Sequence, residues 1–343
     1  MPVLQQVQTE LVNYRDSGIS VLEMSHRSAS FAQIAEHSEK QLRQLLGLDN
    51  DWEVLFLQGG ATSHFCLSAM NLATLGYADH IISGHWSKRA YQQALKVAPA
   101  RIAASSEKIA FCNVPALSQW QHDDASGYVH ITTNETIHGV AYNEIPAPDL
   151  PLVADMSSDF LSRRLDINRF ALIYAGAQKN AGPAGLTFVL VKRAILDQVP
   201  GGLPSMFDYS LLAEKKSMLN TPPVFSWYVA SLVLDWITAE GGLVKMEQLA
   251  KEKSALLYSQ LSAQGFYQNS ISASARSRMN VVFRLPDSAL EDIFLQQAGE
   301  AGMIGLKGHR SIGGLRASLY NAMPLQEVYT LVEFMREFER KYG

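Results

Sequence analysis

The chain has 343 residues, of which 47% are hydrophobic and 18% are charged, and its formal net charge is −4. This composition is typical of a globular protein of one or two domains, and the small negative charge argues against a general nucleic-acid or membrane binder. Cys66 and Cys112 are too few for a disulfide framework, and no apolar run approaches the ~20 residues that span a bilayer, so we expect a cytoplasmic protein.

The first part of the chain alternates short apolar runs with longer helical patterns. Residues 1–18 have the spacing of an amphipathic helix and lack the charged start and apolar stretch of a signal peptide. A further helix is expected over about 64–75, and strands are expected over 53–57, 79–83, 108–113, 127–132, 152–155, 172–175 and 187–191. Strands that alternate with helices predict an α/β fold with a mostly parallel central sheet covered on both faces.

The pattern changes after about residue 240. Helical spacing over 224–238 breaks at Gly241-Gly242, and a long helix begins at about Leu243. Beyond it we expect strands over 279–285 and 314–319, and helices over 287–301 and 325–341. The sequence therefore predicts a large α/β domain, residues 1–250, and a smaller C-terminal α+β domain, residues 251–343, with the boundary inside the long helix.

Two polar residues follow consecutive predicted strands. Lys179 lies among small residues in a loop, where a bulky ligand can approach the backbone and a partly desolvated amine can form a Schiff base; most loop lysines, however, are simply solvated. Asp155 ends the strand before it. It is either a helix cap or turn former, or a carboxylate that pairs with the ring nitrogen of pyridoxal phosphate (PLP). Parallel strands would bring both residues to one sheet edge.

Three further features suit a flat, phosphorylated cofactor. The turn Gly59-Gly60-Ala61-Thr62 joins a strand to a helix and can present backbone N–H groups to phosphate, although glycine pairs are common in turns. It matches neither the P-loop nor the dinucleotide-binding pattern. Trp86 follows a predicted strand and can stack on an aromatic ring, or belong to the core. Thr136 can donate a hydrogen bond to the cofactor, or stabilise a turn.

Two His-Arg pairs, His26-Arg27 and His309-Arg310, occur in loops rich in glycine and serine. Guanidinium groups bind phosphate and carboxylate in bidentate fashion, so the pairs suit an amino acid that carries a phosphate. Neither histidine has a partner at a spacing suited to metal binding, and we expect no metal site.

Several stretches resemble the phosphoserine aminotransferase family, which belongs to the PLP-dependent enzymes of fold type I. These stretches are SVLEMSHR (20–27), TTNETIHG (132–139), VADMSSDFLSR (153–163), IYAGAQKNAGPAGLT (173–187), SMLNTPPVFSWY (217–228), SRMNVVF (277–283) and LKGHRSIGGLRASLYNAMP (306–324). They span about residues 20 to 340, and the combination of AGAQKN, GPAG, NTPP and KGHR is specific.

The resemblance implies roles for individual residues. Lys179 corresponds to the lysine that forms the Schiff base, and Asp155 to the partner of the pyridinium nitrogen. Further cofactor contacts correspond to Ala61, Thr62, Trp86, Thr136 and Gln178. Asn220 and Thr221 correspond to residues that reach the cofactor of the neighbouring subunit, which implies a homodimer. The substrate-binding set corresponds to His26, Arg27, His309 and Arg310.

The implied reaction is amino transfer between L-glutamate and 3-phosphooxypyruvate, giving O-phospho-L-serine and 2-oxoglutarate for serine biosynthesis. Lys179 would move the proton during the transfer. The resemblance extends the substrates to a phosphorylated four-carbon keto acid of pyridoxine biosynthesis.

Three alternatives compete with this hypothesis. One is another fold-type I enzyme acting on an amino acid without phosphate, which the two basic pairs argue against. A second is a cysteine desulfurase, for which neither cysteine is suitably placed. The third follows from a departure: family members usually begin with an extended Gly-Pro segment, whereas this chain begins MPVLQQVQ. A PLP-binding protein with weak or no amino transfer is therefore the alternative function.

Overall fold

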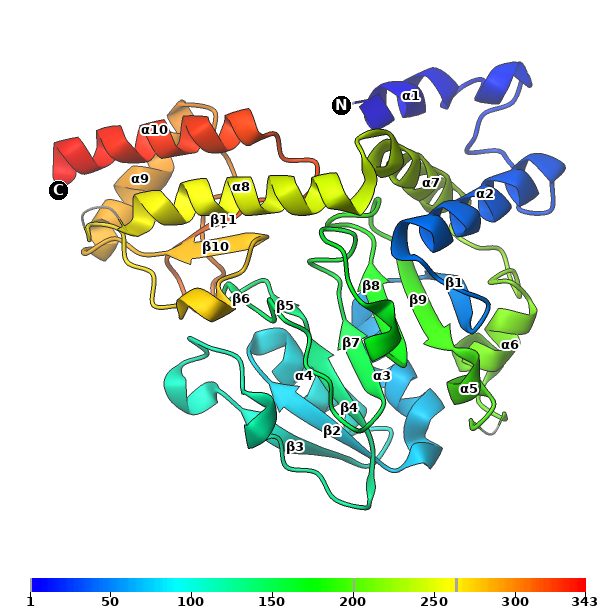
Figure 1. Cartoon of the computed structure of the whole chain (residues 1–343). Helices are drawn as coiled ribbons and strands as arrows, with labels where there is room; N and C mark the ends of the chain where they lie inside the picture. The colour runs from blue at the N-terminus through cyan, green and yellow to red at the C-terminus, as the bar shows by residue number, and fades with distance from the viewer. Residues whose placement is uncertain (1, 200, 263–264) are drawn as a thin grey trace.

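A seven-stranded sheet forms the centre of the computed structural model, which describes residues 2–199, 201–262 and 265–343. The strand order is β1-β9-β8-β7-β4-β2-β3 (Figure 1). The strands are β1 (Trp52–Gln58), β2 (Tyr77–Ile82), β3 (Ala100–Ser105), β4 (Ser126–Thr132), β7 (Leu152–Asp155), β8 (Leu172–Gly176) and β9 (Leu186–Lys192). The strands from β8 to β3 run parallel, whereas β9 is antiparallel to both of its neighbours, β1 and β8.

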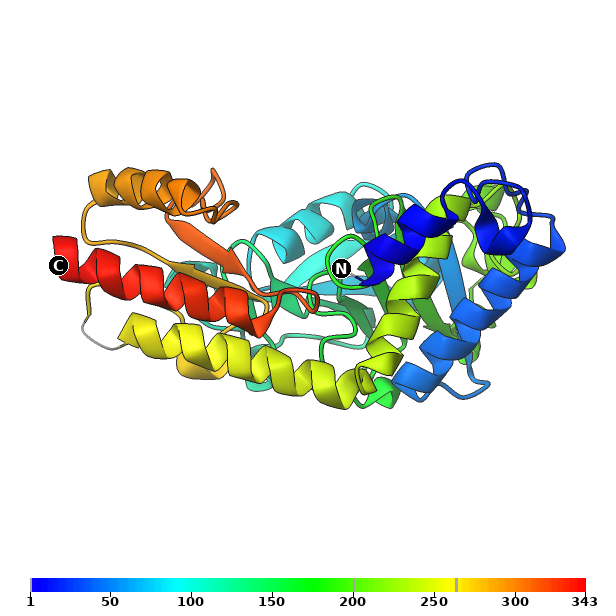
Figure 2. The same ribbon diagram turned by 90° about the horizontal axis from the view of Figure 1, so that it is seen from above.

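Helices cover both faces of this sheet, which explains why its central strands are buried along almost their whole length. All residues of β7 and β8 are buried. One face packs against α2 (Ala29–Leu46) and α7 (Val224–Ala239), which lie side by side in Figure 2. The N-terminal helix α1 (Pro2–Glu10) packs on α7. The other face packs against α3 (Ala61–Leu72), α4 (His85–Ala94) and α6 (Tyr209–Glu214), and α5 (Arg193–Leu196) follows β9. The predicted α/β fold with a mostly parallel sheet is confirmed.

A second hydrophobic core is formed by the end of the chain. The long helix α8 (Gly242–Ser262) leaves the main sheet and runs beside α10 (Leu325–Tyr342) (Figures 1 and 2). Together with α9 (Ser288–Glu300), these helices cover the antiparallel pair β10 (Asn280–Phe283) and β11 (Leu315–Ser318). We call residues 257–262 and 265–343 the C-terminal unit, because their apolar side chains pack mainly on one another.

The structure corrects one predicted strand. Residues 108–113 form no strand, because Ala110 and Phe111 adopt positive φ angles of 51° and 56° in a turn after a short 3-10 helix. The edge strand is instead β3, whose alanine-rich sequence has low β propensity and gave no signal. The N-terminal helix predicted over residues 1–18 is shorter than expected: it begins at Pro2 and ends at Glu10, turns and a short 3-10 helix (Tyr14–Asp16) follow, and Met1 lies outside the described residues.

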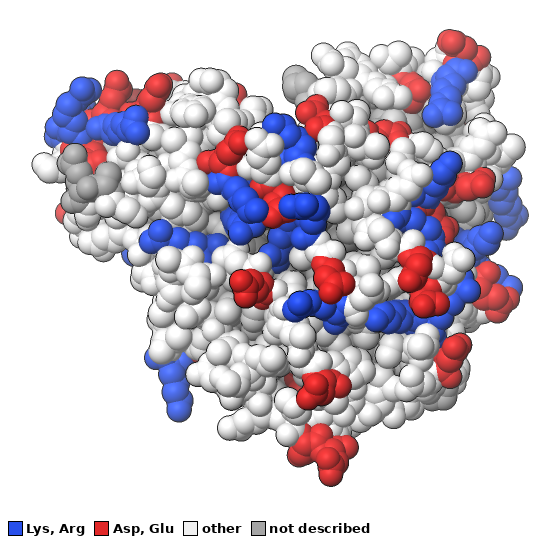
Figure 3. All heavy atoms as spheres, in the orientation of Figure 1, with Lys and Arg blue, Asp and Glu red and all other residues white. Residues whose placement is uncertain are grey.

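Among the described residues, no helix is both long and apolar enough to cross a bilayer. Figure 3 shows that acidic and basic side chains alternate over the face drawn in Figure 1, so this face has no extended region of a single charge. The small hairpin β5 (Asn134–Glu135) and β6 (Val140–Ala141) follows β4 and leads toward the C-terminal unit.

Candidate active site

The candidate site lies where β4, β7 and β8 end, because parallel strands present their carboxyl ends at one sheet edge. Asp155 is the last residue of β7, and Lys179 follows β8 by three residues. The Nζ of Lys179 donates a hydrogen bond of 2.7 Å to Oγ1 of Thr136. The same Nζ lies 5.8 Å from the ring centroid of Trp86. The structure thus brings together four side chains that come from four separate parts of the sequence.

Burial changes the acidity of Lys179. Desolvation lowers the pKa of its ammonium group, and the neighbouring guanidinium of Arg316 lowers it further, whereas the carboxylates of Asp155 and Glu135 oppose this shift. A lysine in this environment is neutral at a lower pH than an exposed lysine. It can therefore act as a nucleophile or accept a proton.

Asp155 is held rigidly at the bottom of the site. Its Oδ1 accepts hydrogen bonds from the backbone N (2.9 Å) and Oγ (2.6 Å) of Ser157. The same Oγ accepts a hydrogen bond of 3.1 Å from the backbone N of Gly176, which fixes the ends of β7 and β8 relative to each other. Burial raises the pKa of Asp155, while the bonds from Ser157 and the charge of Lys179 lower it. Such a carboxylate is suited to pair with a buried cationic ring nitrogen.

Trp86 is positioned by a residue that sequence reasoning missed. Glu135, fully buried, accepts hydrogen bonds from the backbone N–H groups of Trp86 (2.9 Å) and Ser87 (2.8 Å) in the first turn of α4. A carboxylate at a helix N-terminus satisfies free N–H groups and interacts favourably with the helix dipole. Gly84 is required next to it, because a Cβ at this position would lie 2.4 Å from Cδ of Glu135. Glu135 directly precedes Thr136 in the sequence, so one hairpin sets both side chains.

The glycine turn before α3 also belongs to this site. Gly59 has φ 102°, and its backbone N donates a hydrogen bond of 3.0 Å to the carbonyl oxygen of Gly185, in the loop that carries Lys179. Its own carbonyl accepts a hydrogen bond of 3.0 Å from Oγ1 of Thr187. The N-cap residue of α3, Gly60, has no side-chain cap, which leaves the N–H groups at Ala61 and Thr62 available to an anion.

Arg316 is a second residue that sequence reasoning did not select. It lies on β11 of the C-terminal unit, and its Nη1 points to the carbonyl oxygen of Thr136 at 3.5 Å. Its Nε is buried and has no hydrogen-bond partner in the described structure. A buried donor without a partner is costly, so the guanidinium is suited to receive an anionic ligand. Its place in the stretch GLRASLYNAMP was the available signal.

The other predicted residues lie outside this group. In the described part of the chain, no hydrogen bond or ring contact joins His26, Arg27 or Arg310 to Lys179. His309 contacts His85 across the mouth of the site, with ring centroids 5.9 Å apart. Gln178 is exposed beside Lys179. Asn220 and Thr221 are exposed, and Nδ2 of Asn220 donates a hydrogen bond of 3.2 Å to Oε1 of Gln58, just before the glycine turn.

These residues fit PLP. The amine of Lys179, the buried carboxylate of Asp155, the indole of Trp86 and the uncapped N-terminus of α3 are the groups that its aldehyde, ring nitrogen, ring face and phosphate require. The indole Nε1 of Trp86 is buried and has no hydrogen-bond partner in the described structure. A buried polar atom without a partner is expected where a bound ligand would lie next to it.

Comparison with known proteins agrees with this geometry. Residues 1–331 match the family model described as Aminotransferase class-V, so the chain belongs to the class-V aminotransferase family. The phosphoserine aminotransferase of Nitrosomonas europaea is 48% identical over 351 residues, covering 99% of this chain and 95% of the relative.

Two solved structures are also similar over almost the whole chain. Phosphoserine aminotransferase from Bacillus circulans subsp. alkalophilus has a TM-score of 0.97 at 40% identity, covering 100% of this chain and 96% of that one. The PLP-bound phosphoserine aminotransferase from Trichomonas vaginalis has a TM-score of 0.92 at 32% identity, covering 98% and 96%. The family resemblance, the fold type and PLP as the cofactor are therefore confirmed, and the chain is an aminotransferase.

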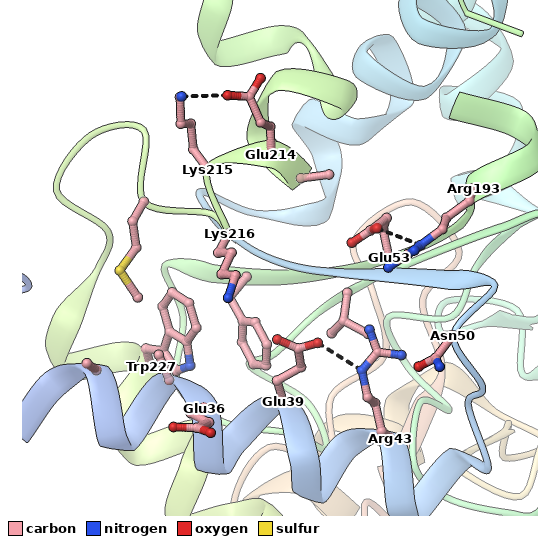
Figure 4. Close-up of a pocket in the computed structure, with 16 residues that line it drawn as sticks. Glu36, Glu39, Arg43, Asn50, Glu53, Arg193, Glu214, Lys215, Lys216 and Trp227 are labelled. Atoms are coloured by element: carbon pink, nitrogen blue, oxygen red, sulfur yellow. Dashed lines mark hydrogen bonds and ion pairs between the residues drawn. The ribbon is translucent and has the colours of Figure 1, made fainter. Parts of the chain in front are cut away.

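A hollow of about 880 Å³ lies elsewhere, between α2, β1 and the segment 213–218 (Figure 4). Six of its charged side chains form ion pairs: Arg43 with Glu39 at 2.8 Å, Arg193 with Glu53 at 2.8 Å, and Lys215 with Glu214 at 2.6 Å. None of the residues that line it belongs to the group around Lys179, so this hollow is separate from the candidate active site.

Proposed function

We propose that this chain is a phosphoserine aminotransferase that transfers the amino group between L-glutamate and 3-phosphooxypyruvate, giving O-phospho-L-serine and 2-oxoglutarate. The observation that carries the proposal is the convergence of Lys179, Thr136, Asp155 and Arg316 at the sheet edge. The names of the relatives at 47–48% identity support the substrate. The phosphorylated keto acid of pyridoxine synthesis is the second substrate of the same site.

Most residues of the site bind the cofactor, and Lys179 also transfers a proton. PLP, when bound, supplies an electron sink for the bond broken at the substrate Cα. Asp155 would hold the cofactor by its ring nitrogen, Trp86 by its ring face, Thr136 and Gln178 by polar contacts, and the turn at Ala61 and Thr62 by its phosphate. Lys179 would supply the amine that binds the cofactor. During turnover it accepts and returns the proton at Cα, for which its lowered pKa suits it.

The substrate is held by arginines from two directions. Arg316 receives the α-carboxylate, because its guanidinium lies beside the carbonyl oxygen of Thr136, near enough to Lys179 to lower its pKa, and its buried Nε has no hydrogen-bond partner in the described structure. His26, Arg27, His309 and Arg310 bind the phosphate. Two of these residues belong to the loop before α2 and two to the C-terminal unit.

We also propose a homodimer in which Asn220 and Thr221 complete the site of the neighbouring subunit. Both side chains are exposed in the single chain. They follow the segment that borders the hollow of Figure 4, in which Met218 is partly exposed. We place the enzyme in the cytoplasm and divide it into domains 1–250 and 251–343. The separate apolar core of the C-terminal unit supports this division.

The half-reaction with L-phosphoserine tests the function directly. The purified protein, loaded with PLP, should show the visible absorption of a lysine-bound cofactor, and L-phosphoserine should convert it to the near-ultraviolet absorption of the aminated cofactor. L-Glutamate should do the same, whereas L-alanine and L-aspartate should react far more slowly. A faster reaction with alanine or aspartate would contradict the phosphorylated substrate, and a coloured protein without any response would favour the PLP-binding alternative.

A further inference from the structure

The short segment between β11 and α10 touches several parts of the molecule at once. We call Tyr320–Met323 the bridging turn. Its first and last carbonyl oxygens accept hydrogen bonds from Nζ of Lys253 on α8, at 2.7 Å and 3.1 Å. Lys253 is only 1% exposed. Burying an ammonium group is costly, and main-chain carbonyls compensate for it less completely than a carboxylate would, so its presence inside α8 requires a reason.

The bridging turn is also bonded to the loop that carries Lys179. The backbone N of Asn321 donates a hydrogen bond of 2.9 Å to Oδ1 of Asn180, the residue after Lys179. Nδ2 of Asn180 in turn donates a hydrogen bond of 3.2 Å to the carbonyl oxygen of Ser158. Both asparagine side chains are buried. The bridging turn is therefore linked to the Lys179 loop through the side-chain amide of Asn180, which is buried away from water.

A third contact reaches the strained chain after Asp155. Nδ2 of Asn321 donates a hydrogen bond of 2.9 Å to the carbonyl oxygen of Leu161. Leu161 is buried and has φ 58°, a conformation that costs a leucine about 1 kcal/mol or more. A backbone strained in this way persists only where its surroundings fix it. The bond from Asn321 is one of these constraints, and it originates in the C-terminal unit.

The same turn fixes the strand that carries Arg316. The hydroxyl of Tyr320 accepts a hydrogen bond of 3.2 Å from Nδ2 of Asn280 on β10, the strand that pairs with β11. Arg316 lies on β11, four residues before Tyr320. A shift of the bridging turn would therefore move Arg316 relative to Lys179, although no hydrogen bond of the described structure joins the turn to either side chain.

We propose that Lys253 is a positioning residue for amino transfer: by fixing the bridging turn to α8, it sets the distance between Arg316 and the loop of Lys179. The inference rests on the proposed role of Arg316 in binding the substrate carboxylate. A role in stability alone would leave substrate binding unchanged in the fraction of protein that remains folded.

The test compares Lys253→Met with Lys253→Arg and with a control on the same helix. Lys251→Met serves as the control, because Lys251 is about half exposed and pairs only with Glu247. In the PLP-loaded enzyme, Lys253→Met should raise KM for both L-phosphoserine and L-glutamate by about tenfold or more, since small misplacements of binding groups are costly. The affinity for PLP should change less than KM, because most of the cofactor residues lie outside the Lys179 loop. Lys253→Arg should have KM values close to those of the wild type.

Amide exchange in the cofactor-free protein gives an independent readout. Lys253→Met should accelerate deuterium exchange in the peptides that cover 176–182 and 315–323, while peptides of β2 and β4 keep their protection. Asn321→Ala removes only the side-chain bond to Leu161, so it should raise KM by a smaller factor. If Lys253→Met does not fold, the KM of Asn321→Ala tests the positioning role instead. Unchanged KM and exchange with a lowered melting temperature would overturn the proposal.

Deuterium exchange also distinguishes a failure of this inference from a failure of the proposed function. If the wild-type enzyme does not respond to L-phosphoserine, the proposed substrate is wrong, while the exchange pattern still reports whether Lys253 fixes the Lys179 loop. If the wild-type enzyme responds and Lys253→Met has an unchanged KM, the positioning role is wrong and the function stands.

Discussion

The charged residues at the site are held by contacts that join separate parts of the sequence. Lys179 has a lowered pKa because it is buried, with charged groups of β5, β7 and β11 around it, and Asp155 keeps its place because Ser157 links it to Gly176 at the end of β8. The sequence could predict Lys179 and Asp155 as neighbours because both follow strands of one parallel sheet. It could not predict Glu135 as the anchor of Trp86, since that contact depends on how the hairpin after β4 folds onto α4.

Arg316→Lys tests the carboxylate site at the scale of one side chain. A lysine keeps the charge but loses the bidentate geometry of the guanidinium, so we expect KM for both amino-acid substrates to rise by roughly 10- to 100-fold, with a smaller change in kcat. Steady-state kinetics with L-phosphoserine and L-glutamate measures this effect. Arg193→Lys is the matched control, because Arg193 pairs with Glu53 at the far end of β9. Equal kinetic constants for both variants would exclude Arg316 from substrate binding.

At the scale of elements, apolar runs bounded by glycine predicted most strands to within a residue or two. β7 was predicted with its observed bounds, and the helices α7 and α9 nearly so. The prediction failed at 108–113, where Ile109 ends a short 3-10 helix and Phe111 lies in the turn after it, and at β3, where alanines at an exposed sheet edge resemble a helix or loop. Edge strands bury only part of their side chains, so their hydrophobic pattern is weak.

The glycine turn before α3 makes a prediction about this element. Gly59 has φ 102°, so Gly59→Ala should destabilise the protein by about 1–2 kcal/mol and weaken PLP binding. Gly60 has φ −108° and open space around the position of a Cβ, so Gly60→Ala should change stability by less than about 0.5 kcal/mol. Urea unfolding of the cofactor-free variants checks the stability effect, and PLP titration checks the affinity. Equal effects of the two substitutions would refute the conformational explanation.

At the scale of the whole molecule, the buried histidines determine how stability depends on pH. His64 bonds to Tyr209 and His130 to Tyr174, and burial lowers the pKa of each imidazole to about 3. Because the folded-state pKa lies below the unfolded value of about 6.5, the unfolded chain binds more protons between these values. The contribution of these histidines to stability is therefore present above pH 6.5 and is lost as the pH falls toward 3.

His130→Gln should reduce this loss by up to about 1.4 kcal/mol per pH unit below pH 6.5, because one proton-binding group of the unfolded state is removed. The free energy of unfolding in urea, measured from pH 7 to pH 5 for the wild type and the variant, gives the difference in slope. Comparing the two proteins cancels the opposite effect of the buried carboxylates, whose pKa values burial raises. His122→Gln, at an exposed histidine, should leave the slope unchanged.

The antiparallel strand β9 has a consequence for the order in which the molecule is completed. β1 pairs with no other strand of the described structure, and β9 is synthesised only after the chain has passed through β2, β4, β7 and β8. On a ribosome, the growing chain must hold β1 and the glycine turn at its end without a partner while the rest of the sheet assembles. Once β9 has been synthesised, it pairs with both β1 and β8. This pairing brings the glycine turn before α3 next to the loop that carries Lys179.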